Sequence, residues 1–153
     1  MRINNNFIRG LILIFLILGV YPIDMEAAGG DSITITVTIK EVIPQIGVTI
    51  RVVPKSKKTR PAVTVSLRAT IRNRGDADDY FTLTASSSLG WEVIFPQGDT
   101  LGPIEPGRRE TVPVKVIVPV DATRGDRNTL TIAAASQFDP SVSDSGFSTI
   151  TVR

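Results

Sequence analysis

Strict alternation of apolar and polar residues is the feature that most constrains how this chain folds. It is clearest in residues 63–72, where apolar residues at the odd positions alternate with threonine, serine and arginine. Successive side chains of a β-strand point to opposite faces, so this period predicts a strand with one buried and one solvated face. The segment ends at Asn73-Arg-Gly-Asp76, a combination that is typical of turns.

The same period recurs through most of the chain, between turns rich in Gly, Pro and Asp. No segment after the N-terminal apolar run has a helical period, and several short strands with regular turns predict an all-β sandwich of two antiparallel sheets. Trp91 is expected in the core of this sandwich. Pro113 is expected at an edge or a bulge, because proline cannot donate a hydrogen bond to a neighbouring strand. Strands are predicted at residues 47–53, 62–72, 80–85, 91–95, 109–118, 130–134 and 150–152.

Residues 1–29 have the order of a secretory signal peptide. Arg2 and Arg9 precede the apolar run 11–18, and the small residues Ala27–Gly30 follow it. The apolar run is shorter than the roughly 20 residues that span a bilayer. We therefore expect cleavage after Gly29 and a secreted or cell-envelope location. The alternative is an uncleaved membrane anchor, and membrane contact is expected through this segment only.

The chain contains neither Cys nor His. This removes cysteine nucleophiles, thiolate and imidazole metal sites and the Ser-His-acid triad. Carboxylate pairs or Ser-Lys dyads would need neither residue, but we expect no catalysis and no cofactor. The net charge is +2, and the one dense basic run, residues 55–60, contains no aromatic residue. We interpret this run as a solvated loop and expect no nucleic-acid binding.

Several motifs resemble a known family. In order, they are Asn73-Arg-Gly75, Tyr80-Phe-Thr-Leu83, Gly90-Trp91, Ile104-Glu-Pro-Gly107 and Val118-Pro-Val-Asp-Ala122. The pattern is similar to the extracellular immunoglobulin-like modules related to the NPCBM-associated domain of alpha-galactosidases. It covers residues 46–153 and implies an immunoglobulin-like antiparallel β-sandwich of about seven strands. Such modules accompany catalytic or anchoring domains, which implies an accessory role. Within the pattern, Gly75 is expected to adopt a positive φ.

Residues 30–46 are predicted to add an extra N-terminal strand and a connector ahead of the domain at 47–153. Ile33, Ile35, Val37 and Ile39 share one face of this strand, and threonines occupy the other. The strand is expected either to pair at an edge of its own sandwich or to insert into another copy of the chain. Insertion would make the protein a homo-oligomeric surface subunit.

The loops at residues 74–79, 97–107 and 137–146 are expected to share one end of the sandwich. Since hard cations need several oxygen ligands in one place, a Ca²⁺ site at this end is one hypothesis. The alternative is turn chemistry, because Asp side chains bond to their own backbone. The calcium hypothesis uses Asp76, Asp78, Asp79 and Asp139. The same end of the sandwich is also expected to hold Asp99, Glu105 and Asp144.

Taken together, these features predict an exported, non-catalytic structural or adhesive binding module whose partner is a protein or a surface polysaccharide. One alternative is a surface subunit that polymerises by exchanging its N-terminal strand. Another is a carbohydrate-binding accessory of a secreted hydrolase. The last would need exposed aromatic residues in a groove, for which Tyr80, Phe138 and Phe147 are the candidates.

Overall fold

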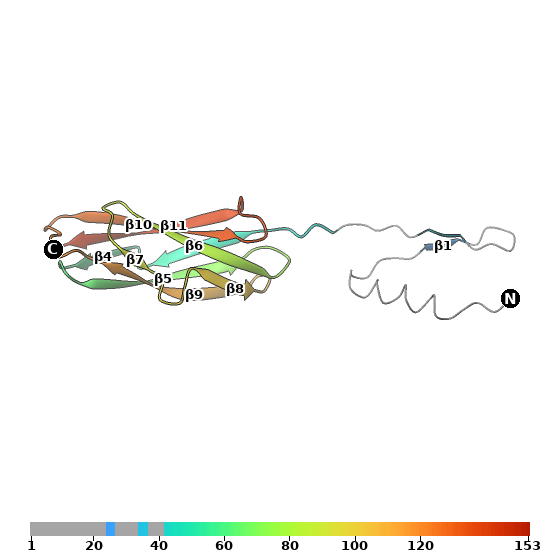
Figure 1. The fold of residues 1–153 in the computed structure, drawn as a ribbon, viewed down its shortest axis with the longest axis horizontal. Coiled ribbons are helices and arrows are strands. Elements are labelled where there is room, and N and C mark those ends of the chain that lie inside the picture. Colours follow the sequence, from blue (N-terminus) through green and yellow to red (C-terminus); the bar gives the residue numbers. More distant parts are fainter. Residues whose placement is uncertain (1–23, 27–33, 37–41) are drawn as a thin grey trace. The chain divides into compact units, whose positions relative to one another are not determined.

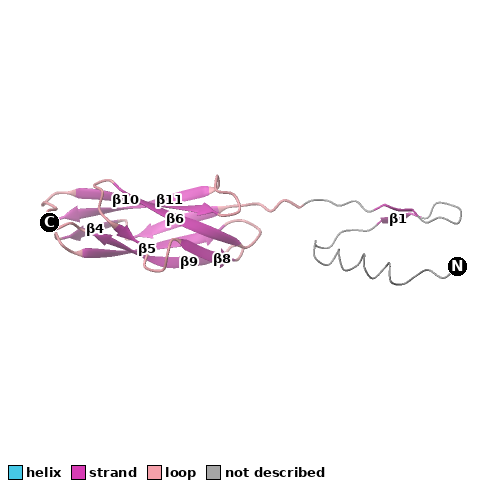
Figure 2. Ribbon diagram, viewed as in Figure 1, coloured by secondary structure: helices cyan, strands magenta, loops and turns pink. Residues whose placement is uncertain are grey.

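The computed structural model describes residues 24–26, 34–36 and 42–153. The chain divides into two compact units, residues 1–43 and 44–153. All regular elements in the described residues are β-strands (Figures 1 and 2). Over these ranges, no helix is long and apolar enough to cross a membrane.

The first unit contains a two-stranded antiparallel sheet. β1 (Asp24–Glu26) pairs with β2 (Thr34–Thr36), and Met25 lies opposite Ile35. β2 belongs to the segment expected either to pair within its own sandwich or to insert into another copy, and both alternatives stay predictions. Its partner β1 falls inside the predicted signal peptide. Ile33, Val37 and Ile39 lie outside the described residues.

Residues 44–153 form an immunoglobulin-like β-sandwich of two sheets, as predicted (Figure 1). Neighbouring strands are antiparallel except β4 and β11, which are parallel. The five-stranded sheet has the order β4 (Ser56–Thr59), β11 (Ser143–Val152), β10 (Arg127–Ser136), β6 (Asp79–Ser87) and β8 (Thr100–Ile104). The four-stranded sheet has the order β3 (Val48–Val53), β5 (Thr64–Asn73), β9 (Arg109–Ile117) and β7 (Val93–Ile94).

The alternation in the sequence becomes the core between the two sheets. Along β5, β9 and β10 the burial of residues alternates with the predicted period. Trp91 is 6% exposed, which confirms it as a core residue. The largest fully buried side chains come from both sheets: Phe81, Leu67, Ile71, Leu130, Ile132 and Ile150. Pro113 pairs with Arg68 of β5 on one side of β9. On the other side, β7 pairs only with Lys115 and Val116, so Pro113 has no neighbouring strand there and its expected edge position is confirmed.

Two short strands lie in segments that were expected to be loops. β4 occupies the basic run and pairs only with β11, and β8 occupies the loop at 97–107 and pairs only with β6. The sandwich therefore has five strands in one sheet and four in the other, rather than about seven in all. Both are edge strands with mostly exposed residues, so neither shows the apolar alternation that predicts a strand. The basic run is solvated as expected, but it is not a loop.

The expected positive φ at Gly75 is wrong, because the glycines with positive φ are at other positions. A different constraint requires glycine there. A Cβ atom on Gly75 would lie 2.5 Å from the carbonyl oxygen of Gln45, well inside van der Waals contact. Glycine thus lets the entering chain pass directly over the turn that follows β5.

The side chain of Asn73 connects three segments at this end of the sandwich. It is 1% exposed and uses both halves of its amide. Its Nδ2 donates to the carbonyl oxygens of Ala77 and Ile104, each at 2.7 Å, and its Oδ1 accepts from the N–H of Gly75 at 2.8 Å. The amide therefore closes the β5–β6 turn and attaches it to the end of β8.

The backbone of Asn73 adds a fourth segment. Its N–H donates to the carbonyl oxygen of Arg108 at 3.0 Å, and its C=O accepts from the N–H of Gly107 at 3.0 Å. The incoming chain is attached to the same turn, since Gln45 and Asp76 exchange two hydrogen bonds of 2.9 and 3.1 Å. One buried residue thus organises the end of the sandwich where the chain enters.

We expect N73A to lower the free energy of unfolding by about 3 kcal/mol, because it leaves two carbonyl oxygens and one N–H without their partner. Urea denaturation of residues 44–153 followed by circular dichroism measures this. D78A in the same turn is the control, and its exposed side chain should change stability by less than about 0.5 kcal/mol. Equal effects of the two variants would contradict the structural role of the amide.

Candidate functional site

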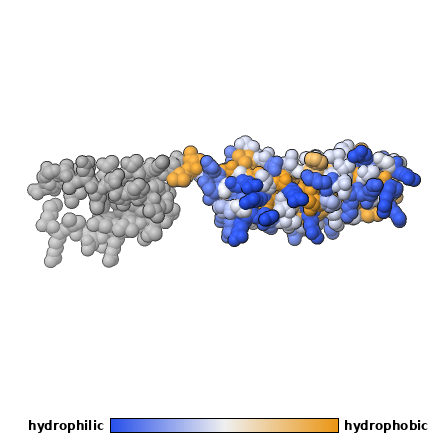
Figure 3. Space-filling view, turned by 180° about the vertical axis from the view of Figure 1, so that it is seen from behind, coloured by the Kyte–Doolittle hydropathy of each residue, from blue (hydrophilic) through white to orange (hydrophobic). Residues whose placement is uncertain are grey.

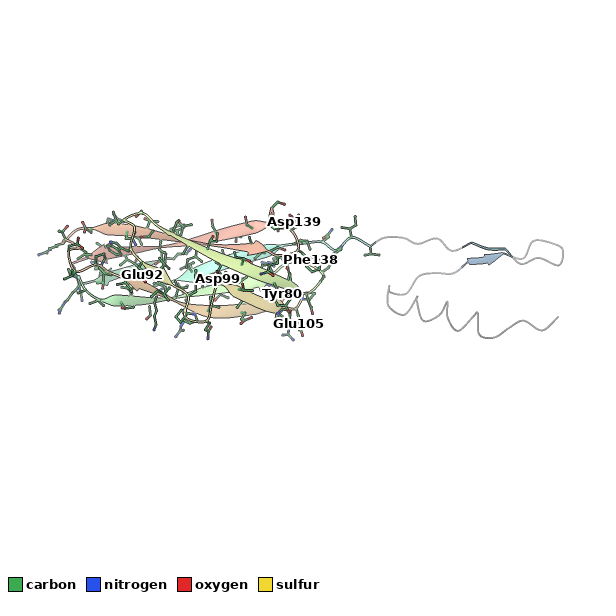
Figure 4. The ribbon with its side chains drawn as sticks, in the orientation of Figure 1. Tyr80, Glu92, Asp99, Glu105, Phe138 and Asp139 are labelled. Atoms are coloured by element: carbon green, nitrogen blue, oxygen red, sulfur yellow. The ribbon has the colours of Figure 1, made fainter. Side chains whose placement is uncertain are left out.

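The acidic loops meet at one end of the sandwich, largely as predicted. The backbone bonds of Asn73 join the loops 74–78 and 105–108, and the N–H of Gln137 donates to the carbonyl oxygen of Tyr80 at 2.8 Å. Figure 4 shows Glu105 and Asp139 at this end. Asp99 lies further along the body of the sandwich, where its carbonyl oxygen accepts from the N–H of Leu83 at 2.7 Å, so its predicted placement is wrong.

Three of the four predicted calcium ligands accept hydrogen bonds from other residues of the protein. Asp79 is 2% exposed, and its Oδ2 accepts from the hydroxyl of Ser136 at 2.5 Å. The oxygen of Ser136 in turn accepts the N–H groups of Phe138 and Asp139, both at 3.1 Å. Asp79 thereby fixes the turn between β10 and β11, which is a structural role for a buried carboxylate.

Asp139 caps its own turn. Its Oδ1 accepts from the hydroxyl of Ser141 at 2.6 Å and from the N–H of the same residue at 3.0 Å. These two bonds hold the pKa of Asp139 below its ordinary value, the hydroxyl contributing most. Asp76 bonds to the N–H of Gln45, and Asp78 is exposed.

In the part of the chain that the structure describes, no group of three or more acidic, His or Cys residues is placed to hold a metal ion. The local turn bonding expected as the alternative is seen at Asp139, whereas Asp76 and Asp79 bond to residues distant in sequence. Calcium binding at these residues stays a prediction.

The candidate aromatic residues do not form one platform. Tyr80 and Phe138 are 44% and 64% exposed and lie at the acidic end (Figure 4). Phe147 is elsewhere on β11, where the ammonium group of Lys55 lies 4.6 Å from the centre of its ring. The structure therefore gives a carbohydrate-stacking groove built from these three residues no geometric support.

A groove that was not predicted opens between β6 and β7, with a volume of about 440 Å³. Leu83 and Ala85 of β6 line one side, and Trp91, Val93 and Phe95 line the other. The backbone N–H of Trp91 donates to the hydroxyl of Ser87 at 2.8 Å, which fixes the turn that joins the two sides. Figure 3 shows the sandwich from behind, where hydrophilic residues are interspersed with hydrophobic ones. The groove has the same mixed character, since Thr84, Ser87 and Asp99 line it beside the apolar residues.

β6 has an open edge beside this groove. β8 pairs with β6 only up to Thr82, and the bond from Leu83 to Asp99 is the last contact on that side. Peptide groups alternate sides along a strand, so the N–H and C=O of Ala85 point in the same direction as those of Leu83, toward the open edge. The described strands leave residues 84–87 with a neighbour, β10, on one side only.

Ala85 is the residue at which sequence reasoning missed this feature. The alternation placed it in the core with Phe81 and Leu83, but it is exposed. The period is correct, since Ala85 does face the groove. What the sequence does not show is that the neighbouring β8 begins only at Thr100 and leaves the second half of β6 uncovered.

No family model matches the chain, and no curated protein sequence matches it. Among solved structures, the chain is similar to a family 123 glycoside hydrolase from Clostridium perfringens (TM-score 0.49, 8% identity, 69% of this chain and 27% of the other). It is also similar to the secreted serine protease VesC from Vibrio cholerae (TM-score 0.48, 14% identity, 71% of this chain and 23% of the other). A third similar structure is the periplasmic chaperone SfaE (TM-score 0.45, 11% identity, 68% of this chain and 57% of the other).

The chain thus spans about a quarter of the first two of these proteins and just over half of the third. At these identities and TM-scores, the similarities carry no information on what this chain binds. The immunoglobulin-like β-sandwich stands on the two sheets described above. The narrower relation to the NPCBM-associated modules is not shown.

Thermal unfolding in about 10 mM CaCl₂ and in EDTA tests the calcium hypothesis. A site with a millimolar dissociation constant would add about 1.4 kcal/mol and raise Tm by about 5 °C. Since three of the four candidate carboxylates accept hydrogen bonds from the protein and the described residues form no metal-binding group, we expect a shift below about 1 °C. A larger rise that disappears in D139N would establish the calcium site.

Proline substitution tests the direction of the β6 peptide groups. Ala85→Pro removes an N–H that faces the open edge, so we expect stability to change by less than about 1 kcal/mol. Thr84→Pro removes an N–H that faces β10, where Thr84 pairs with Ala133, and we expect a loss of about 3 kcal/mol or more. Urea denaturation of both variants measures this, and a reversed order would refute the open edge.

Proposed function

We propose that this chain is an exported, non-catalytic β-sandwich module that binds an extended polypeptide by adding it as a strand to the open edge of β6. The observation that carries the proposal is the combination of that edge, residues 84–87, with the groove beside it. In strand addition, main-chain hydrogen bonds supply affinity and pockets for alternate side chains supply specificity. Export is proposed from residues 1–29, and a non-catalytic role from the absence of His and Cys.

The groove is lined by apolar and polar residues, and its position beside the open edge supports a partner whose side chains alternate between groove and solvent. An added strand would place every second side chain between Leu83 and Ala85 on one side and Trp91 and Val93 on the other. The intervening side chains would face solvent. A partner with small or β-branched apolar residues at alternate positions therefore fits.

A second candidate function is self-assembly, in which the added strand is the N-terminal segment of another copy. Residues 33–39 alternate isoleucine or valine with threonine, as the groove requires. The described part of this segment, β2, pairs with β1, which belongs to the predicted signal peptide. Cleavage after Gly29 would remove that partner. Val42 and Ile43 of the connector are 80% and 77% exposed and would extend the apolar segment.

The relation to the NPCBM-associated modules is also a proposal. It is supported by the structural roles of the shared motifs: the buried amide of Asn73, the core ring of Trp91 and the turn at Gly107.

Size-exclusion chromatography with light scattering tests both candidates. Residues 30–153 and 45–153 are compared, each with and without Ala85→Pro. For self-assembly, we expect the longer chain to form concentration-dependent oligomers that both the deletion and the proline abolish, because one removes the donor strand and the other an acceptor N–H.

A synthetic peptide of residues 31–43, titrated into chain 45–153, isolates the acceptor. Binding that Ala85→Pro weakens at least about tenfold supports strand addition. A longer chain that stays monomeric while the peptide still binds would favour a foreign partner. Failure of the peptide to bind, together with oligomers that Ala85→Pro leaves unchanged, would contradict strand addition at β6.

A further inference from the structure

The geometry points to a second binding surface, for a linear acidic polysaccharide, on the outward face of the four-stranded sheet. This inference is independent of the groove beside β6. The outward positions of β3, β5 and β9 alternate with the buried ones and contain no acidic residue. These positions carry five cations: Arg51, Arg68, Arg72, Arg109 and Lys115.

The strand register brings three of these arginines together. Arg72 lies directly opposite Arg109 on β9 and opposite Thr49 on β3, and Arg51 lies opposite Thr70 in the next row. The three arginines border a hollow of about 190 Å³ that Thr49, Ile50 and Thr70 also line. Three planar donors and two hydroxyl groups around one hollow form a site for an anionic group, since arginine binds carboxylate and sulfate-like oxygens through paired hydrogen bonds.

The remaining cations extend the charge beyond the hollow. Lys115 is six residues from Arg109 on β9, which corresponds to about 20 Å along the strand. Arg68 lies between them on β5, opposite Pro113. A single small anion would contact only the hollow. A linear polymer with repeated anionic groups could contact all five cations.

The arrangement is unfavourable for the isolated fold. Like charges directly opposite each other on neighbouring strands are destabilising, and Arg72 and Arg109 form such a pair. Within the described residues, the one ion pair joins Arg108 to Glu105 at 3.6 Å and involves none of the five cations. Glu110 lies opposite the inward-facing Ile71, and it borders a separate hollow with Glu105 and Arg109. An anionic ligand would relieve the repulsion that the protein itself leaves in place.

The chemistry between the cations favours a polysaccharide over other polyanions. Thr49 and Ser66 stand between the charges and can bond to sugar hydroxyls. Thr70 and Thr111 share one hydrogen bond of 2.8 Å between their hydroxyls, and each oxygen keeps further capacity for a sugar hydroxyl. The outward positions of β3, β5 and β9 contain no aromatic residue, so the face offers no stacking for bases and no interfacial aromatic anchor for a membrane. Sequence reasoning missed this face because its cations come from three strands rather than one run.

Binding of residues 30–153 to polygalacturonate, dextran sulfate and neutral dextran tests the inference, with a DNA duplex and phosphatidylglycerol vesicles as competing classes of ligand. We expect binding to one or both acidic polymers that weakens as salt is raised, and none to neutral dextran. Preference for polygalacturonate would identify carboxylate as the anionic group, and preference for dextran sulfate would identify sulfate.

R51S/R72S/R109S should weaken that binding at least about tenfold. The matched control, K57S/K58S/R60S, removes the same three charges from β4 and its loop, and should weaken binding less than about twofold. R51S/R109S is the second variant, because it keeps the hydrogen bond from Arg72 Nε to the carbonyl oxygen of Gly107 at 3.0 Å. R51K/R72K/R109K should bind with intermediate affinity, since lysine keeps the charge but not the paired donors.

Ala85→Pro should leave polymer binding unchanged, which separates this surface from the one proposed for strand addition. Equal loss in the β3–β5–β9 and β4 variants would overturn the inference, because binding would then follow net charge alone. Stronger binding to DNA or to vesicles than to either acidic polysaccharide would overturn it as well. A cooperative thermal transition confirms that each variant remains folded.

Discussion

Burial of one face of each sheet against the other is the constraint on which the rest of this structure depends. The alternating aliphatic residues of β5, β9, β10 and β11 have no other way to leave water, and their burial supplies the main stabilisation of such a domain. Once those faces are committed to the core, the outward faces, the edges and the ends are available for other roles. Each of the three carries a distinct feature here.

The end where the chain enters is built for rigidity. Asn73 satisfies its amide and its backbone entirely within the protein. Ser136 bonds to Oδ2 of Asp79 and so fixes the neighbouring turn, while Oδ1 of Asp79 has no partner in the described part of the chain. Buried polar groups that are fully bonded specify one arrangement of the loops. This explains why an end rich in carboxylates does not present them as a set of ligands.

The edge and the outward face carry the features that suit binding. Along β6, the short β8 leaves peptide groups without a neighbouring strand next to Trp91 and Phe95. On the other sheet, cross-strand pairing gathers arginines into a surface that the fold itself does not neutralise. Strand addition at the edge and polyanion binding on the face use separate elements, so one module could hold a protein partner and a surface polymer together.

The sequence by itself determined the fold class, the faces of the main strands and the core position of Trp91, because period-two alternation is a local property that any register preserves. It also located most of the acidic loops at one end, since that follows from counting strands. Only the tertiary structure decided where pairing stops: β4 and β8 carry no alternation, and the exposure of Ala85 depends on how far β8 extends along β6. The cluster of Arg51, Arg72 and Arg109 likewise depends on register between strands that are distant in sequence, which no local pattern encodes.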